Sequence, residues 1–233
     1  MKVEICANSY QSAKAAQHGG AHRIELCSEL EVGGVTPSHG LIAKVVCELS
    51  IPVHVLIRPR SGNFIYTAAE LDVMLRDIEF CKSMGCAGVV TGALDDDGHV
   101  DMAFAERLIA ASAPLHFTFH RAFDCVQEPV DTLEKLKQLG VQRILTSGLK
   151  PKAIEGLDLL KKLKAVAGDI EIMPGSGINA GNCITFKEEG FTSIHLSAIR
   201  KQEKEDFGES LFGKENLPTT DETLVREVVD LVS

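Results

Sequence analysis

The stretch 115–124, LHFTFHRAFD, is the best starting point for inferring the fold of this 233-residue chain. Apolar and polar side chains alternate through its first six residues, which is the period of two that a β-strand requires. The strand then ends in a polar cluster formed by His120, Arg121 and Asp124. One strand cannot form a pocket, so the fold has to be inferred from the segments on either side.

The flanking segments repeat one unit, which is a short apolar strand, a polar residue at its end, a loop and an amphipathic helix. Eight strands are predicted, at residues 3–6, 23–27, 53–57, 88–91, 115–120, 143–146, 170–173 and 193–196. Eight such units in a chain of this length predict an α/β fold, a TIM-like (β/α)8 barrel, whose chemistry collects at the C-terminal ends of the strands. We expect a single domain over residues 1–233, because the chain is too short for two ordinary α/β domains.

Capping residues, glycines and prolines mark the ends of the predicted helices. These helices span about residues 9–18, 38–49, 67–84, 101–111, 129–139, 151–167 and 222–232, and we place none between the seventh and eighth strands. Residues 201–221 are charged and lack an apolar period, so we expect an extended or mobile loop before the last helix.

Composition and charge argue against several classes of protein. The formal net charge is −9 and no basic cluster occurs, which argues against binding nucleic acid or an anionic membrane surface. No apolar run approaches the roughly 20 residues that a membrane-spanning helix needs. The chain enters its first strand at Val3 without a signal-peptide pattern, and its seven cysteines lack the spacing of a disulfide scaffold. We therefore expect a cytoplasmic protein with free thiols.

The first two strands end in similar tetrapeptides, VEIC and IELC, each with an acid two residues before a cysteine. Cys6 and Cys27 therefore lie at matching ends of neighbouring strands, which are about 4.8 Å apart, and their thiols could meet. A pair of thiolates is a soft site that suits Cu(I). The alternative is that both cysteines are small apolar core residues, since free cysteine is among the most buried residue types.

Other polar residues follow the third and fifth strands. Arg58 and Arg60 point the same way, and their guanidinium groups suit a carboxylate or phosphate, although pairing with Glu4 or Glu25 in a structural ion network is the alternative. His120 lies where barrels place catalytic groups and could act as an acid, a base or a ligand, or could be a structural histidine.

The seventh and eighth strands lead into small and polar residues. Gly175, Gly177 and Ser197 occupy the region where many barrels bind phosphate through backbone N–H groups, although loop geometry alone would also explain the glycines. His195 lies two residues before Ser197 and so shares its face of the strand. It either lines the same interior or is a core histidine.

Six blocks of sequence are similar to one known family. The blocks VEIC, GGAHRIELCSEL with GGVTPS, IRPRSGNFIYT, TFHRAFD, RILTSG and IMPGSGIN resemble the CutC copper homeostasis family, and they extend from about Val3 to Ser197. The resemblance implies a cytoplasmic TIM-like barrel that is linked to copper tolerance and binds Cu(I) through Cys6 and Cys27. It also implies a homo-oligomer, for which we favour a dimer. Its matching blocks place Arg58, Arg60, His120 and Asp124 in a family pocket.

Two hypotheses about function follow. The first is a copper-handling protein with Cu(I) on Cys6 and Cys27. The second is an enzyme that acts on a small anionic or phosphorylated substrate. The residues for the anion would be Arg58, Arg60, Gly175, Gly177 and Ser197, and those for proton transfer His120, Asp124 and Glu25. Under both hypotheses, we expect four side chains to converge on one pocket at the barrel mouth. They are Glu25, Arg58, Arg60 and His120.

Overall fold

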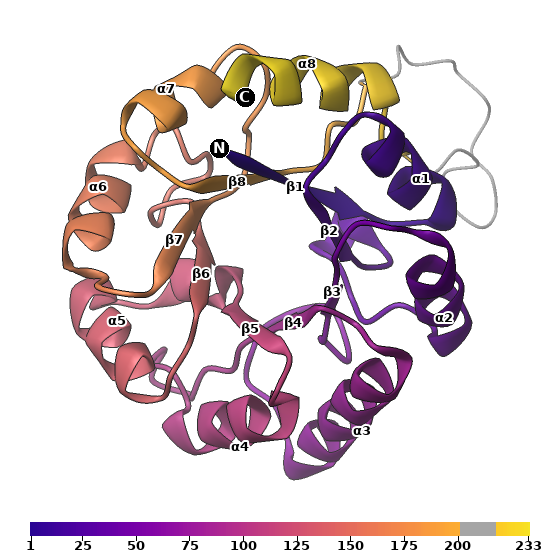
Figure 1. Ribbon diagram of the computed structural model, residues 1–233. Helices are drawn as coiled ribbons and strands as arrows, with labels where there is room; N and C mark the ends of the chain where they lie inside the picture. Colours follow the sequence, from indigo (N-terminus) through magenta and orange to yellow (C-terminus); the bar gives the residue numbers. More distant parts are fainter. Residues whose placement is uncertain (201–217) are drawn as a thin grey trace, which may run out of the picture.

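The computed structural model describes residues 1–200 and 218–233. Eight parallel strands form the ring at the centre of Figure 1 in the order β7-β6-β5-β4-β3-β2-β1-β8. The strands are β1 (Lys2–Ala7), β2 (Arg23–Leu26), β3 (Val53–Leu56), β4 (Gly88–Thr91), β5 (His116–Phe119), β6 (Arg143–Thr146), β7 (Glu171–Pro174) and β8 (Ser193–Leu196). A parallel bridge between Gly175 and His195 brings β7 next to β8 and closes the ring. The predicted single-domain (β/α)8 fold is confirmed.

Helices surround the ring of strands on its outer side (Figure 1). They are α1 (Tyr10–His18), α2 (His39–Glu48), α3 (Ala68–Met84), α4 (Met102–Ser112), α5 (Pro129–Gln138), α6 (Leu157–Val166), α7 (Cys183–Glu188) and α8 (Glu222–Val232), with short 3-10 turns η1 (Leu30–Val32) and η2 (Arg121–Cys125). Within the described ranges, none of them combines the length and apolar character needed to cross a membrane. The N-terminal ammonium group of Met1 donates to the carbonyl of Val232 at 2.8 Å.

Side-chain caps explain where several helices begin. The hydroxyl of Thr67 accepts from the backbone N–H of Glu70, and the Glu70 carboxylate accepts from the backbone N–H of Thr67 at 2.7 Å. This reciprocal capping box satisfies two N–H groups that the first turn of α3 would otherwise leave unpaired. The same helix ends at Gly85, whose φ of 76° lies in the left-handed region that glycine adopts without strain.

The structure departs from the predicted elements between β6 and β8. Helix α7 was missed, because Asn182 before it makes no side-chain cap and the helix has only 6 residues. Helix α6 begins at Leu157 rather than near residue 151, since the preceding residues form turns that end at Gly156. Of the expected loop 201–221, residues 201–217 lie outside the described ranges, and Thr220 pairs with Ile199 in an antiparallel bridge.

The main apolar core lies between the strands and the helices. Outward-facing residues such as Ile5 and Ile24 are fully buried there, and so are Leu71 and Met74 of α3. Burying such aliphatic side chains supplies most of the driving force for folding. The space inside the ring of strands contains a different set of side chains.

Candidate functional site

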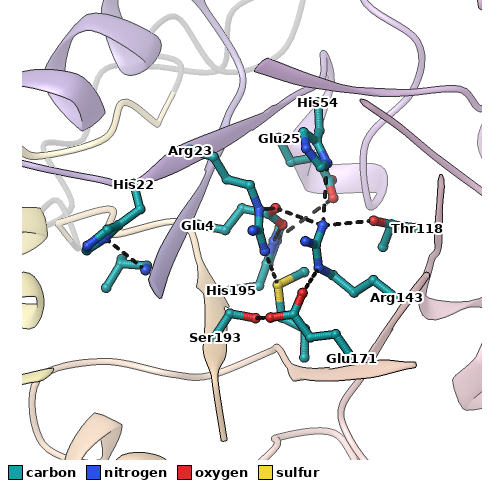
Figure 2. Close-up of polar contacts among 12 residues, drawn as sticks. Glu4, His22, Arg23, Glu25, His54, Thr118, Arg143, Glu171, Ser193 and His195 are labelled. Atoms are coloured by element: carbon teal, nitrogen blue, oxygen red, sulfur yellow. Dashed lines mark hydrogen bonds and ion pairs between the residues drawn. The ribbon is translucent and has the colours of Figure 1, made fainter. Parts of the chain in front are cut away.

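The interior of the barrel is polar, whereas barrels of this class are usually filled by layers of branched apolar side chains. Because side chains alternate along a strand, every second residue of each strand faces inward. Figure 2 shows this group, whose labelled members include Glu4, Arg23, Glu25, His54, Thr118, Arg143, Glu171, Ser193 and His195. Such buried charges are stable only if they are paired and hydrogen-bonded.

Ion pairs between strands hold the charges nearer the N-terminal ends of the strands. Arg23 pairs with Glu4, and Arg143 donates to Glu171 at 2.6 Å and to the hydroxyl of Thr118 at 3.1 Å. Burial alone would raise the pKa of Glu4, but Arg23 and a hydrogen bond with His195 outweigh it and hold that pKa well below its usual range. Glu4 is therefore a carboxylate at neutral pH.

Two histidines lie beside these arginines, and their rings are 5.3 Å apart between centroids. Burial lowers the pKa of His54 to about 3 and that of His116 to about 4, and in both cases the neighbouring Arg143 acts in the same direction. Both rings are therefore neutral at physiological pH. A neutral imidazole adds no further charge next to the guanidinium groups.

His195 connects the ion pairs to the upper part of the barrel interior. Its Nδ1 lies 2.8 Å from Glu4 Oε1 and 4.0 Å from Glu25 Oε2. Burial would lower the pKa of His195, but the carboxylates of Glu25 and Glu4 outweigh it and raise that pKa. Burial raises the pKa of Glu25 to about 7. His195 thus lies between two acids that favour its protonated form.

The two thiols lie above this group, nearer the C-terminal ends of β1 and β2. Cys6 Sγ lies 3.6 Å from Cys27 Sγ and 3.9 Å from Glu25 Oε1. The hydrogen bond with Cys27 and burial raise the pKa of Cys6 well above its ordinary value. Leu30, Leu56 and Val90 pack around the pair. Cys6 is therefore a protonated, enclosed thiol until a ligand displaces its proton.

This part of the interior contains a potential metal-ligand set. One ligand atom from each of Cys6, Glu25 and His195 lies within 4.8 Å of the others, and all three residues are buried. Glu25 Oε2 has no hydrogen-bond partner within residues 1–200 and 218–233. Together with Cys27, these residues offer two sulfurs, one oxygen and one nitrogen, a set that suits copper or zinc. The sequence left His195 either lining the interior with Ser197 or in the core, and it gave no sign that His195 lies beside Glu25 and Cys6.

Arg58 does not extend a free guanidinium group into the mouth. Its Nη1 donates to the carbonyls of Val32 at 2.9 Å and Gly34 at 2.8 Å, and its Nη2 donates to the carbonyl of Gly62 at 2.6 Å. The guanidinium also lies 4.9 Å from the centre of the Phe64 ring. These contacts hold the loops after β2 and β3 together. Its role in anion binding stays a prediction.

Arg60 pairs with its own loop and with the start of α3, so the expected convergence of four side chains on one pocket is wrong at this position. Its guanidinium pairs with Glu70 at the start of α3 and donates to the carbonyl of Ile65 at 2.7 Å. The Glu70 carboxylate that caps α3 therefore also holds the arginine. Because Arg60 precedes the loop that leads to α3, pairing with the helix is a local contact.

His120 is buried and faces the loop that Arg58 supports. Its Nδ1 accepts from the backbone N–H of Ala122 at 3.3 Å, and its ring centroid lies 4.7 Å from that of Phe64. Burial, reinforced by the charge of Arg58, lowers the pKa of His120 to about 3. The neutral ring therefore carries its proton on Nε2, which has no hydrogen-bond partner in the described part of the chain. His120 can donate a hydrogen bond to a ligand.

Asp124 is fully used as an acceptor. Its carboxylate accepts from the hydroxyl of Thr146 at 2.5 Å, the backbone N–H of Ser147 at 3.0 Å and that of Leu149 at 3.2 Å. Arg121 also donates to it at 2.7 Å. Asp124 thereby fixes the loop after β6. A catalytic role in proton transfer stays a prediction.

The small residues after β7 and β8 lie at different depths. A Cβ atom on Gly175 would come within 2.5 Å of Leu145 Cδ1, so only glycine fits there beside the interior. Gly177 has a φ of 69°, and the carbonyl of Ser197 accepts from the hydroxyl of Thr220 at 3.1 Å. Their role in binding an anion stays a prediction.

Comparison with known proteins adds the family. A description of the CutC family matches residues 1–200. A CutC family protein from Pasteurella multocida is 47% identical over 199 residues, which cover 84% of this chain and 82% of the relative. The human copper homeostasis protein cutC homolog is 48% identical over 198 residues, or 84% of this chain and 72% of the relative.

Solved structures agree with the sequence matches. The CutC crystal structure from Streptococcus agalactiae has a TM-score of 0.80 at 34% identity, and the match covers 84% of this chain and 98% of that one. Thiamine phosphate pyrophosphorylase from Pyrococcus furiosus has a TM-score of 0.62 at 14% identity over 99% of this chain and 95% of that one, a likeness that shows the barrel fold alone. On the family match and these identities, the chain belongs to the CutC family.

Proposed function

We propose that this protein takes part in copper homeostasis in the cytoplasm and that it binds Cu(I) through Cys6 and Cys27. The observation that carries the proposal is the separation of 3.6 Å between their two sulfur atoms inside the barrel. The name of the human relative, a copper homeostasis protein, supports the link to copper. Soft thiolate sulfurs select Cu(I) over hard cations.

The surroundings of the two thiols favour a monovalent soft ion in a further way. Two thiolates and one Cu(I) carry a net charge of −1, whereas two bare thiolates would place a charge of −2 among Leu30, Leu56 and Val90. Burying unpaired charge is costly, so Cys6 stays protonated until copper arrives. Binding of Cu(I) therefore releases the proton of Cys6 to solvent.

The test is a titration of reduced protein with Cu(I) in competition with a chromogenic Cu(I) chelator. We expect the wild-type protein to hold one equivalent, and Cys6→Ser with Cys27→Ser to lose at least 100-fold in affinity. A matched control is the double variant Cys81→Ser with Cys86→Ser, which removes two other buried thiols. Equal affinity in wild type and in the Cys6, Cys27 variant would exclude this pair as the copper site.

A homo-oligomer, and a dimer before other states, is part of the same proposal. It rests on the resemblance to the family. Sedimentation equilibrium of the reduced protein gives the mass of the particle directly, and a mass of one chain of 25.2 kDa across the micromolar range would contradict it.

A second candidate function is an enzyme that binds a small anion near β3 and β5. Its supporting observation is that Arg58 Nε, Tyr66 OH and His120 Nε2 are buried and have no hydrogen-bond partner among the described residues. All three are donors, which suits an anionic ligand. Stabilisation by millimolar phosphate in a thermal melt, weakened in His120→Asn, would support it. No stabilisation of the wild-type protein would count against it.

A further inference from the structure

The thiols are one part of a larger set of potential ligands. Going across the interior, Cys27 Sγ lies 3.6 Å from Cys6 Sγ, which lies 3.9 Å from Glu25 Oε1. Glu25 Oε2 is 4.0 Å from His195 Nδ1. One ligand atom from each of Cys6, Glu25 and His195 lies within 4.8 Å of the others, and Cys27 extends this set through its contact with Cys6, so that β8, β1 and β2 all contribute side chains.

We propose that Cys6, Cys27, Glu25 and His195 form a four-coordinate site for a divalent ion of borderline softness, with Zn²⁺ as the type. This site uses the same two thiols as the proposed copper site. Only its use of these two thiols rests on the proposed copper function. Glu25 and His195 are the new ligands.

The spacing of the sulfurs fits a four-ligand site with little rearrangement. With metal–sulfur bonds of about 2.3 Å, a linear unit separates its sulfurs by about 4.6 Å and a tetrahedral one by about 3.8 Å. The observed separation of 3.6 Å between Cys6 Sγ and Cys27 Sγ is close to the tetrahedral value. The thiols are therefore positioned for an ion that also takes ligands from the side of Glu25 and His195.

Charge is the second argument. When all four residues serve as ligands, the two thiolates and the Glu25 carboxylate carry −3, so Cu(I) in this full set would leave −2 in a buried place, whereas a divalent ion leaves −1. Arg23 cannot offset the difference, because it is paired with the fully buried Glu4. Since buried charge is costly, the complete ligand set favours the divalent ion.

The surroundings of the two new ligands are the third argument. Glu25 is 5% exposed, and its Oε2 has no hydrogen-bond partner within the described ranges, so this oxygen is available to a ligand. The Glu4 carboxylate holds the ring of His195 through Nδ1 at 2.8 Å, which leaves Nε2 as the nitrogen that would bind the ion. A carboxylate behind a histidine fixes ring orientation and raises ligand basicity in zinc sites.

The experiment titrates reduced, metal-free protein with ZnCl₂ against a zinc-binding dye, and with Cu(I) against its own chelator. We expect one equivalent of zinc in the wild type, and at least a tenfold loss of zinc affinity in both Glu25→Gln and His195→Gln. Cu(I) affinity should change less than threefold in both. The matched control is His54→Gln, which removes another buried inward histidine and should leave zinc affinity within threefold of wild type.

X-ray absorption of the zinc-loaded wild type gives a readout that does not depend on the variants folding. We expect two sulfur and two nitrogen or oxygen neighbours. A first shell of sulfur alone, or of nitrogen and oxygen alone, would overturn the proposal, as would unchanged zinc affinity in both folded variants. If the wild type holds zinc with these ligands but no Cu(I), the proposed copper function fails while the four-ligand site stands. If Cu(I) binds to the thiols and zinc does not bind, the four-ligand site fails while the proposed copper function stands.

Discussion

Arg58 donates through Nη1 to the backbone carbonyl of Gly34 at 2.8 Å, so a side chain from the end of one strand supports the loop that follows its neighbour. The same guanidinium holds the carbonyls of Val32 and Gly62. Backbone carbonyls that lose a buried donor keep their desolvation cost without compensation. The arginine thus contributes to the shape of the mouth, whatever ligand the barrel binds.

Arg58→Ala should therefore destabilise the protein strongly. Three carbonyls would lose their donor, and we expect the free energy of unfolding to fall by about 3 kcal/mol. Urea denaturation measures the change. Arg76→Ala is the control, because that side chain is 76% exposed and its loss should change stability by less than about 0.5 kcal/mol. Similar losses of stability from the two substitutions would contradict the role of Arg58 in supporting these loops.

Gly34→Ala should perturb the loop and the thiols together. The residue has a φ of 83°, and an added Cβ would lie 2.6 Å from Leu56 Cδ2 and 3.3 Å from Cys27 Cβ. We expect a loss of about 2 kcal/mol or more from strain and overlap. Gly85→Ala isolates the strain, because φ there is 76° with nothing within 4 Å, and it should cost about 1 kcal/mol. Equal losses in thermal or urea unfolding would show that the close approach to Leu56 has no cost.

Asp124→Asn should loosen the loop after β6 without removing bulk. The amide keeps one acceptor oxygen but presents an NH₂ group to donors such as the backbone N–H of Ser147, which now bonds the carboxylate at 3.0 Å. We expect a loss of about 3 kcal/mol and faster hydrogen exchange at Ser147 and Leu149. Asp96→Asn, in an exposed turn, is the control and should stay within about 0.5 kcal/mol. Unchanged exchange at both amides would argue against this role of Asp124.

His120 should make the fold sensitive to acid. Burial and Arg58 lower its pKa to about 3. An unfolded chain binds a proton at this ring below about pH 6.5, so the stability that the neutral ring provides is present above that pH and is lost as the pH falls towards 3. His120→Asn keeps an acceptor for the N–H of Ala122 but cannot titrate. Urea unfolding between pH 6 and pH 4 should show a slope shallower than wild type by up to about 1.4 kcal/mol per pH unit. Parallel slopes would mean that the ring takes up its proton in the folded state.

The fold was predictable because its signals are local. Each strand carries apolar residues at least at every second position, and capping residues lie within three positions of the N–H group that they satisfy, as Thr67 does with Glu70. Helix α7 escaped because it is short and has no side-chain cap. The resemblance of six sequence blocks identified the CutC family, which the comparisons confirmed.

The site was only partly predictable, because some of its contacts join residues far apart in the sequence and others are made to backbone groups. The proximity of Cys6 and Cys27 follows from matching strand ends, and the sulfurs do lie 3.6 Å apart. The contact of His195 with Glu4 joins residues 191 positions apart and depends on how β8 pairs with β1, which no local pattern reveals. Arg58 was expected to face a ligand. Its partners in the structure are backbone carbonyls, which have no signature in a sequence, so this pairing could not be predicted. One signal could have predicted the position of Arg60. Glu70, which forms the capping box with Thr67, also pairs with that arginine at the start of α3.

The buried ion pairs also constrain how related sequences can diverge. Removing one member, such as Glu4 or Arg143, leaves a charge stranded in the interior and costs about 3–5 kcal/mol, while replacing a whole set by apolar residues of similar volume is often neutral or stabilising. Single substitutions in this layer are therefore selected against, and viable lineages change its members in concert. In an alignment of descendants, Glu4 with Arg23 and Arg143 with Glu171 should appear as covarying pairs, whereas the aliphatic residues under the helices should drift one at a time.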